Sequence, residues 1–335
     1  MPWGLTQARN MTEPAQEIYV DVWLGILSVI VVLANCFVCA LVCFNKTLRT
    51  YTNWLILSLA VSDILTGGVL LPLILIKPTS LVTGYVIAII LLSGVANICA
   101  VTYDRYVAII KPLLYPYRAP KFFKRAIVAS WLIPTIYTLL PLAWDTNPTQ
   151  TIHIVYVVCL ELFGVVVPYI FITFAYVRIF RQVRQSLTMR KDFESAREQR
   201  KERRRISSDA QVAKVFCIVS TAFLLSWLPI LYSTTVNTVL NRPDLLPGVL
   251  FDSISLFTVA TSSLVNPLTY AFLKPDFKVV LRNFCHRNSQ TEGVSKKRDI
   301  PSSCCQAGTE KNTKHRDQEI AKLEGKSPAE YDTYL

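Results

Sequence analysis

The stretch VWLGILSVIVVLANCFVCALVCF (Val22–Phe44) contains no Asp, Glu, Lys or Arg. A helix needs about 20 mostly apolar residues to cross the hydrocarbon core of a membrane. Four further stretches also contain none of these residues: Pro78–Tyr103, Ala126–Trp144, Val215–Asn241 and Ser253–Leu273. Two more contain a single one, Asp63 in Thr52–Ile76 and Glu161 in Ile154–Val177. A soluble helical core would need polar faces that these stretches lack. The sequence therefore predicts an all-α membrane protein whose core is a seven-transmembrane helix bundle.

The formal net charge of +12 over 335 residues comes from Lys and Arg outside the seven stretches. A basic excess can indicate nucleic-acid binding, but here it lies in alternate loops and is densest in 178–205, so we predict no nucleic-acid partner. Loops rich in Lys and Arg face the cytoplasm. We therefore predict a multi-pass protein of the plasma membrane with an extracellular N-terminus, a cytoplasmic C-terminus and no cleaved signal peptide.

Four parts follow one another along the predicted chain: an extracellular tail (1–20), the transmembrane bundle (21–273), a short amphipathic helix 8 (274–286) and a disordered cytoplasmic tail (287–335). Helix 8 is amphipathic because its apolar residues recur at helical spacing: Phe277, Val280, Leu281 and Phe284. The tail is polar and charged, which favours disorder. The inner segment between the fifth and sixth helices predicts that both extend beyond the membrane.

Several classes of function have no support in the residues. None of the nine cysteines lies in a predicted outer loop, so we predict no extracellular disulfide. We find no nucleophile–base set, no metal-spaced cluster and no phosphate-binding glycine loop, so we predict no enzyme and, apart from a possible sodium ion at Asp63, no metal or cofactor. A transporter or channel would show repeats and several charges along a path, and the seven stretches hold only two acidic residues, Asp63 and Glu161.

Asp63 is a carboxylate midway along the second stretch. A charge at that depth costs about 2.5–3.5 kcal/mol on insertion scales, so it needs a partner, a proton or an ion. Plausible partners in the bundle interior are Asn35 in the first stretch and, in the seventh, Ser262, Ser263 and Asn266. The residues leave two interpretations open, a sodium or proton site and a protonated structural carboxyl.

Arg105 lies at the predicted inner end of the third stretch. Its guanidinium can be held by adjacent Asp104 and by Asp209 at the start of the sixth helix. Such a pair would clamp two helices, and its release would let the sixth helix move outward. The alternative is an ordinary membrane-edge arginine that extends its side chain to water.

Two prolines predict hinges in the later helices. Pro229 interrupts the backbone hydrogen bonds of the sixth helix. Trp227 lies two residues earlier, with Phe223 one turn below it, so a kink here could couple an upper pocket to motion at the inner end. Pro267 does the same in the seventh helix, next to Asn266 and one turn before Tyr270. In isolation, Trp227 could equally be a core residue.

Together these motifs resemble the rhodopsin-like (class A) G protein-coupled receptors over about Val22–Cys285. The matching residues are Asn35, the run Leu59-Ala60-Val61-Ser62-Asp63, Asp104-Arg105-Tyr106, Trp131, Pro168, Tyr176, Phe223, Trp227, Pro229 and Asn266-Pro267-Leu268-Thr269-Tyr270. The resemblance implies an extracellular small-molecule ligand and coupling to a heterotrimeric G protein, with arrestin and receptor kinases as further partners. It also allows a receptor-like protein with a constitutive or modulatory role and no diffusible agonist.

The chain departs from the family at positions that bear on the ligand. Ser80 stands where most members have a disulfide cysteine, Ile87 where amine receptors have an Asp, and Ala260 where opsins have a retinal-binding Lys. The remaining candidate for recognition is Glu161, which can bind a cationic or hydrogen-bonding ligand or be a structural acid. The predicted pocket residues are Ile87, Glu161, Trp227, Tyr232, Thr234 and Asp252, and the ligand is amine-like or lipid-like.

Four short motifs lie outside the bundle. Asn10 begins a glycosylation sequon, and Ser207 follows an Arg pair typical of basophilic kinase sites. Cys285 ends helix 8, where receptors of this type are often palmitoylated. Thr333 and Leu335 fit a PDZ ligand, a terminal peptide that a PDZ-domain protein binds at a sheet edge. Each motif is short enough to occur by chance.

Overall fold

The computed structural model describes residues 14–76, 81–144, 151–188, 196–245 and 249–283, which are helical and contain no strand. The helices, in chain order, are α1 (Pro14–Phe44), η2 (Lys46–Leu48), α2 (Tyr51–Leu65), η3 (Thr66–Leu70), α3 (Leu71–Ile76), α4 (Leu81–Ile110), α5 (Tyr115–Leu139), η4 (Leu140–Ala143), α6 (Thr151–Glu161), η5 (Leu162–Val166), α7 (Val167–Thr188), α8 (Ala196–Thr234), η6 (Thr235–Val239), η7 (Pro243–Leu245) and α9 (Val249–Leu273). A last helix covers 275–283.

Among these residues, seven helical segments are long and apolar enough to cross a membrane, which confirms the predicted seven-helix bundle. Three of the seven are composite, because a π-helical segment interrupts the α-helix: η3 after α2, η5 between α6 and α7, and η6 after α8. A π-helical turn accommodates one extra residue and is frequent at functional sites. The sequence did not predict these three interruptions.

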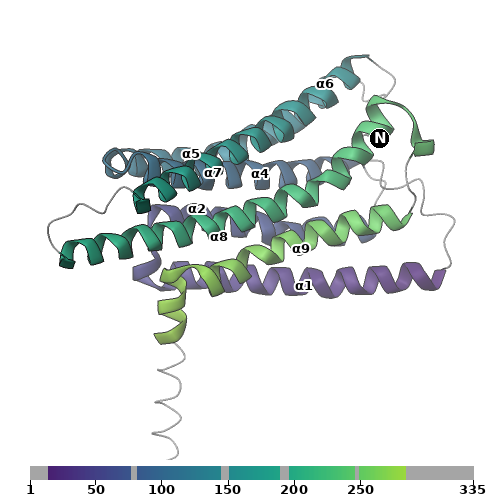
Figure 1. Ribbon diagram of the computed structural model, residues 1–335. Helices are drawn as coiled ribbons and strands as arrows, with labels where there is room; N and C mark the ends of the chain where they lie inside the picture. The colour runs from purple at the N-terminus through teal and green to yellow at the C-terminus, as the bar shows by residue number, and fades with distance from the viewer. Residues whose placement is uncertain (1–13, 77–80, 145–150, 189–195, 246–248, 284–335) are drawn as a thin grey trace, which may run out of the picture. The chain divides into compact units, whose positions relative to one another are not determined.

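The order of packing puts α4 in the middle of the bundle. It contacts α2, α5, α7 and α8, whereas α1 packs against α2 and α9, and α8 packs against α7 and α9 (Figure 1). Large apolar side chains point away from the bundle, as membrane-facing residues do, and examples are Leu33, Ile133 and Phe163. Polar side chains such as Asn35 and Asp63 are buried instead. The bundle therefore places its polar residues where a signalling site could form.

Several predicted boundaries can be compared with the structure. The fifth and sixth helices do extend beyond their apolar spans, since α7 continues to Thr188 and α8 begins at Ala196. Helix α1 begins at Pro14, earlier than the apolar stretch, and proline suits the first turn of a helix because its φ is already helical. Helix α8 runs through Pro229 without ending and bends in its second half (Figure 1). Residues 284–286 of the predicted helix 8 lie outside the described residues.

Candidate functional site

A charged cluster joins three helices at one end of the bundle. Arg105 at the end of α4 donates from Nε and Nη2 to Asp104 Oδ2, at 3.0 and 2.6 Å. Thr52 of α2 donates to the same oxygen at 2.8 Å, and the Tyr115 hydroxyl of α5 donates to Oδ1 at 3.2 Å. Arg105 Nη2 also donates to the hydroxyls of Thr52 and Tyr115. We call these four residues the Arg105 cluster, and their end of the bundle the Arg105 end.

The pairing of Asp104 with Arg105 confirms the sequence prediction, and the rest of the cluster is new. The side chain of the other predicted partner, Asp209, lies outside the described side chains. Asp104 is buried and the Arg105 side chain is 14% exposed, so the pair is largely removed from water. Tyr106, by contrast, is packed against the apolar core. Removing one partner from a buried ion pair leaves an uncompensated charge, which is costly in free energy. If Asp104 and Arg105 separate, each must therefore gain another partner.

Lys274 is a second buried charge at the same end, and sequence reasoning missed it. Its ammonium donates to the Asn53 side-chain oxygen of α2, lies 3.7 Å from Asp276 and stands 5.1 Å from the ring centre of Phe277. The lysine is only 2% exposed. Burial, with the nearby positive charge of Arg105, lowers the pKa of Lys274 to about 8. A lysine at a helix end is ordinarily interpreted as a residue at the membrane surface, so its residue type alone does not indicate burial.

The Asp63 network connects the first, second and seventh spans, as predicted. Asn266 Nδ2 donates to Asp63 Oδ2 at 2.6 Å, and the Ser263 hydroxyl also bonds to this carboxylate. Asn35 Nδ2 donates to the Ser263 carbonyl at 3.2 Å. Ser262, which the sequence also suggested, donates instead to the Val259 carbonyl of its own helix at 2.8 Å. The side-chain oxygens of Asn35 and Asn266 are buried and have no hydrogen-bond partner.

Two tyrosines point into the bundle between this network and the Arg105 cluster. The Tyr176 hydroxyl of α7 accepts from Thr102 of α4 at 3.5 Å and from Ser220 of α8 at 3.4 Å. Tyr270, one turn after Pro267 in α9, is buried between the rings of Phe216 and Phe277, at 6.0 and 6.2 Å. Its hydroxyl is buried without a partner. Apolar packing therefore holds the Tyr270 side chain, and its hydroxyl has no partner among the described residues.

Trp227 and Phe223 stack one turn apart on α8, with ring centres 6.0 Å apart, and both are buried. Phe223 fills the space beside Gly94 of α4, where an added Cβ would lie 3.2 Å from the Phe223 ring. A larger residue at Gly94 would therefore push on Phe223. This contact links the predicted pivot, which lies just before Pro229, to the central helix α4.

Glu161 lies at the opposite end of the bundle, which we call the Glu161 end. Its carboxylate accepts from the Thr235 hydroxyl at 3.0 and 3.2 Å. The predicted neighbours bond elsewhere: Thr234 donates to the Ile230 carbonyl at 2.9 Å, and Tyr232 donates to the Leu245 carbonyl at 3.0 Å. Glu161 immediately precedes the π-helical η5 and Thr235 begins the π-helical η6. Irregular helix segments on two spans thus bring one acid and one hydroxyl together.

Two further predicted pocket residues complete this end. Ile87 of α4 is buried, at 5% exposure, as an apolar wall residue would be. The side chain of Asp252 lies outside the described side chains.

An aromatic group nearby has polar atoms without partners, and sequence reasoning missed it. The ring of Tyr156 in α6 lies 5.7 Å from Tyr137, 5.7 Å from Trp144 and 6.0 Å from His153. His153 is 1% exposed, and neither of its ring nitrogens has a hydrogen-bond partner. The indole nitrogen of Trp144 is also buried and unpaired. Among the described residues these three nitrogens therefore have no partner, and unpaired buried polar atoms are costly.

Within the described part of the chain, no three His, Cys, Asp or Glu side chains gather as metal ligands would. The six cysteines described there are free: Cys36, Cys39, Cys43, Cys99, Cys159 and Cys217.

Comparison with known proteins adds to this geometry. The profile of the family described as 7 transmembrane receptor (rhodopsin family) matches residues 34–270. Trace amine-associated receptor 5 of Homo sapiens is 29% identical over 76% of this chain and 80% of that protein. Histamine H2 receptor of Homo sapiens is 27% identical over 95% of this chain and 93% of its own length. Melanopsin of Phodopus sungorus is 25% identical over 78% of this chain and 61% of that protein.

Proposed function

We propose, from the premise that this chain belongs to the rhodopsin family of seven-transmembrane receptors, that Glu161 is the residue that binds its ligand. As a member, the chain is a multi-pass membrane receptor and not an enzyme. It couples small-molecule binding to activation of a heterotrimeric G protein. The ligand itself is the open question, and the chemistry of the Glu161 end supports an answer.

Among the residues that the structure describes, Glu161 has no partner that matches its charge. A carboxylate at membrane depth needs a cation, a proton or several donors, and Thr235 supplies one neutral hydroxyl, which it also donates to the Leu231 carbonyl. A protonated amine would add a charge-assisted hydrogen bond, which is roughly twice as strong as a neutral one. Two similar receptors carry amines in their names, trace amine-associated receptor 5 and histamine H2 receptor. We therefore propose a small amine as the ligand.

The apolar Ile87 supports the same assignment. By the resemblance given above, amine receptors of this family carry an Asp at this position. The buried Ile87 side chain can make only apolar contacts with a ligand. The acidic partner would then come from α6 rather than α4. The aromatic group around Tyr156, together with the Trp227 ring, would cover the apolar part of the amine.

A panel of biogenic amines and lipids, applied to cells with a second-messenger readout, tests this proposal. Replacement Glu161→Gln keeps the shape and removes the charge, so amine potency should fall about 10- to 100-fold, as for loss of a charged hydrogen bond. Asp244→Asn is the control. The Asp244 side chain is 58% exposed and pairs with Arg242 outside the predicted pocket. Unchanged amine potency in Glu161→Gln would exclude the proposal and favour the lipid-like class.

The orientation and the partners beyond the G protein remain proposals. The Arg105 end faces the cytoplasm, because the Lys- and Arg-rich loops adjoin it. There the G protein, and after it arrestin and receptor kinases, would bind. The N-terminus would lie outside the plasma membrane. Antibody access to an N-terminal tag, but not to a C-terminal tag, on intact cells checks this orientation.

In this mechanism, ligand binding shifts a population of conformations. An ammonium on Glu161 draws α6 toward the ligand and replaces the Thr235 bond, which frees η6 at the top of α8. Rearrangement of α8 is transmitted through Trp227 and Phe223 to α4, where Gly94 contacts Phe223. Opening of the Arg105 end then requires Arg105 and Tyr270 to find partners in the G protein complex. Only contacts that differ between the two states can drive this shift.

We also propose that Asp63 holds a sodium ion in the inactive state. The chemistry of the site fits, because a hard cation prefers oxygen ligands, and two buried side-chain oxygens there, of Asn35 and Asn266, have no partner. A bound ion would neutralise the Asp63 carboxylate. Sodium should lower agonist affinity in the unmodified receptor and have no effect in Asp63→Asn, as measured by radioligand binding at constant ionic strength.

The predictions for the chain ends lie outside the described side chains and remain proposals: glycosylation at Asn10, phosphorylation at Ser207, palmitoylation at Cys285 and a PDZ ligand at Thr333 and Leu335. Palmitate labelling lost in Cys285→Ala, and pull-down by a PDZ domain lost when Leu335 is removed, test two of them.

A further inference from the structure

Three residues beside Tyr156 have buried polar atoms without a partner among the described residues: Nδ1 and Nε2 of His153, Nε1 of Trp144 and Oγ1 of Thr138. The rings of His153 and Trp144 pack on the Tyr156 ring. The Thr138 carbonyl accepts from the Tyr156 hydroxyl at 3.5 Å. We call His153, Trp144 and Thr138 the His153 group. Because unpaired buried polar atoms are costly, a molecule that pairs them would be stabilised at this position.

Helix α6 carries both His153 and Glu161. His153 stands eight positions before Glu161, which separates the two by about 12 Å along the helix axis at 1.5 Å per residue. His153 and Val157, which lies midway, are 1% and 3% exposed. The Glu161 carboxylate meets Thr235 of the neighbouring span. The bundle-facing side of α6 therefore presents a neutral polar group, an apolar surface and a carboxylate in succession.

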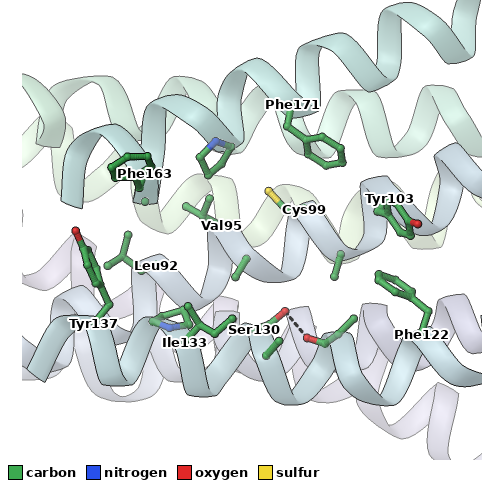
Figure 2. A pocket seen from close by; sticks show the side chains of 17 residues that line it. Leu92, Val95, Cys99, Tyr103, Phe122, Ser130, Ile133, Tyr137, Phe163 and Phe171 are labelled. Carbon is green, nitrogen blue, oxygen red and sulfur yellow. Dashed lines mark hydrogen bonds between the residues drawn. The ribbon is translucent and has the colours of Figure 1, made fainter. Parts of the chain in front are cut away.

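Tyr137 of α5 lies between the His153 group and an apolar groove. Its ring packs on the Tyr156 ring, with ring centres 5.7 Å apart. The same side chain lines one end of a groove between α4, α5 and the η5–α7 segment (Figure 2). None of the residues that line this groove is charged, and its Ser130 hydroxyl donates to the Ala126 carbonyl at 2.8 Å. A polar ligand group is therefore better matched by the His153 group than by the groove.

The His153 group contains hydrogen-bond donors and acceptors but no permanent charge. An indole N–H only donates, a threonine hydroxyl donates and accepts, and a neutral imidazole does one at each nitrogen. A ligand hydroxyl also donates and accepts, so it can pair with this set. An ammonium would lack a carboxylate among the three side chains, which is costly for an ion taken out of water. The ring that carries the hydroxyl can pack on Tyr156 and Trp144 in the offset or edge-on geometry that aromatic pairs prefer.

Given the proposed role of Glu161 in binding an amine, on which this assignment rests, we infer that the ligand is an arylalkylamine with a hydroxyl on its ring. The His153 group binds the hydroxyl, and Glu161 binds the ammonium. Two hydrogen bonds of about 2.8 Å each take up roughly half of the ~12 Å between the two positions. A benzene ring with a two-carbon side chain is long enough for the remainder, and it lies along Val157.

The hydroxyl determines specificity rather than only adding a contact. An amine without it fills the same space but leaves the His153 group unpaired. A site built to hydrogen-bond a hydroxyl rejects the analogue that lacks it, because the buried polar atoms of the site then stay without a partner. Glu161 therefore sets the affinity for amines in general, and the His153 group selects among them.

Tyramine and 2-phenylethylamine differ only in the ring hydroxyl, so the ratio of their potencies measures its contribution. In cells with the full-length receptor and a second-messenger readout, tyramine should be more potent by about tenfold, as for one or two hydrogen bonds. His153→Phe should bring the ratio close to one by weakening tyramine alone. Trp144→Phe should lower the ratio in part. His153→Gln, which keeps a donor and an acceptor, should retain part of the preference.

Tyr156→Phe is the matched control within the same group of rings. The Tyr156 hydroxyl already donates to the carbonyls of Tyr137 and Thr138, so its loss should shift both amines together and leave the ratio unchanged. The potency of 2-phenylethylamine in each variant, with receptor at the cell surface, shows whether that variant is folded.

Glu161→Gln separates this inference from the proposed function. It should weaken both amines equally and keep their ratio. A ratio that depends on His153, with no effect of Glu161→Gln, would reject the role of Glu161 and support the His153 group. Equal potency of the two amines in the unmodified receptor, or a ratio that neither His153→Phe nor Trp144→Phe changes, overturns the inference even where Glu161→Gln abolishes the response. A receptor that responds to neither amine overturns it as well.

Discussion

The two ends of this bundle treat buried polar groups in opposite ways. At the Arg105 end, Asp104 accepts hydrogen bonds from Arg105, Thr52 and Tyr115, and Lys274 bonds to Asn53. At the Glu161 end, the carboxylate accepts from one hydroxyl of the described residues, that of Thr235. His153 and Trp144 there have buried nitrogens without a partner in the part of the chain that the structure describes. One end is closed by its own side chains, and the other leaves polar groups for a further molecule.

The contrast suits a receptor, because the two ends have different tasks. A site that waits for a ligand keeps unsatisfied groups whose cost the ligand removes on binding. A site that holds an inactive state needs pairs that are stable until an alternative partner arrives. The contrast predicts that substitutions at the Arg105 end raise activity without ligand, whereas substitutions at the Glu161 end change the response to ligand or the stability.

The largest effect is expected for Asp104→Asn. It leaves the Arg105 guanidinium buried without its carboxylate, and removal of one partner from a buried pair costs about 3–5 kcal/mol. If this energy favours the inactive state, agonist-free signalling should rise toward the agonist-stimulated level. Second-messenger production without agonist, normalised to receptor at the cell surface, measures the change.

The control for this substitution is Asp244→Asn. Asp244 forms a comparable ion pair with Arg242 at 2.8 Å, but both side chains are more than half exposed at the other end of the bundle. Exposed pairs of this kind contribute little, so basal signalling should not change. Basal signalling that stays low in Asp104→Asn would show that the Arg105 cluster does not hold the inactive state.

The next effect concerns the pH dependence of stability at Lys274. Its pKa falls from 10.5 to about 8 in the folded protein because burial disfavours the charge. Between these two values the unfolded chain binds more protons than the folded chain, so stability rises with pH across that window. The full rise is about 3 kcal/mol at 1.36 kcal/mol per pH unit. Lys274→Met should abolish it, as thermal unfolding in detergent from about pH 7 to about pH 10 would show.

Lys278→Met is the matched control, since Lys278 lies four residues after Lys274, in the helix that follows it, and is exposed. Its removal should leave the pH profile of the unmodified receptor intact. If stability still rises with pH in Lys274→Met, another group causes the pH dependence. Below about pH 8 the Lys274→Met receptor should also be the more stable one, by less than the full amount because Asn53 loses its donor.

The sequence was sufficient for features that depend on one helix at a time. Charge-free stretches predict spans because length and composition decide membrane insertion. Asp63 and Glu161 were conspicuous because acids are rare inside such spans. Asp104 and Arg105 are neighbours in the chain, so their pairing needed no knowledge of the other helices. A buried acid needs polar partners, which made Asn266 a candidate, and the structure confirms its contact with Asp63.

The features that were missed depend on how helices are rotated and aligned against one another. Successive residues of a helix point about 100° apart, so Ser263 faces Asp63 while Ser262 bonds to its own backbone. Thr235 rather than Thr234 meets Glu161 because η6 begins there, and no residue type marks a π-helical turn. Lys274 was missed because its burial is created by residues of another helix, in particular Asn53.

A smaller effect is expected at His153, which tests the open character of the Glu161 end. His153→Phe keeps a ring beside Tyr156 and removes two unpaired buried nitrogens. Because an unpaired buried polar group costs about 1–3 kcal/mol, the ligand-free receptor should become more stable by about that amount, while amine potency falls. Thermal unfolding and the second-messenger assay measure the two effects. A loss of stability instead would mean that His153 already has a structural partner, such as an ordered water.

The smallest effect is expected for Thr235→Val. This substitution tests whether the Thr235 hydroxyl competes with the ligand for the Glu161 carboxylate. Loss of a neutral hydrogen bond to Glu161 should lower stability by about 1 kcal/mol. The same loss frees the carboxylate for an ammonium, so amine potency should rise a few-fold, on the order of a factor that 1 kcal/mol allows. Thr234→Val is the matched neighbour, because its hydroxyl bonds only to the Ile230 carbonyl in the structure. If amine potency falls together with stability in Thr235→Val, Thr235 helps to bind the ligand and does not compete with it. The Glu161 carboxylate would then not be waiting for a partner, and the proposed difference between the two ends of the bundle would be wrong.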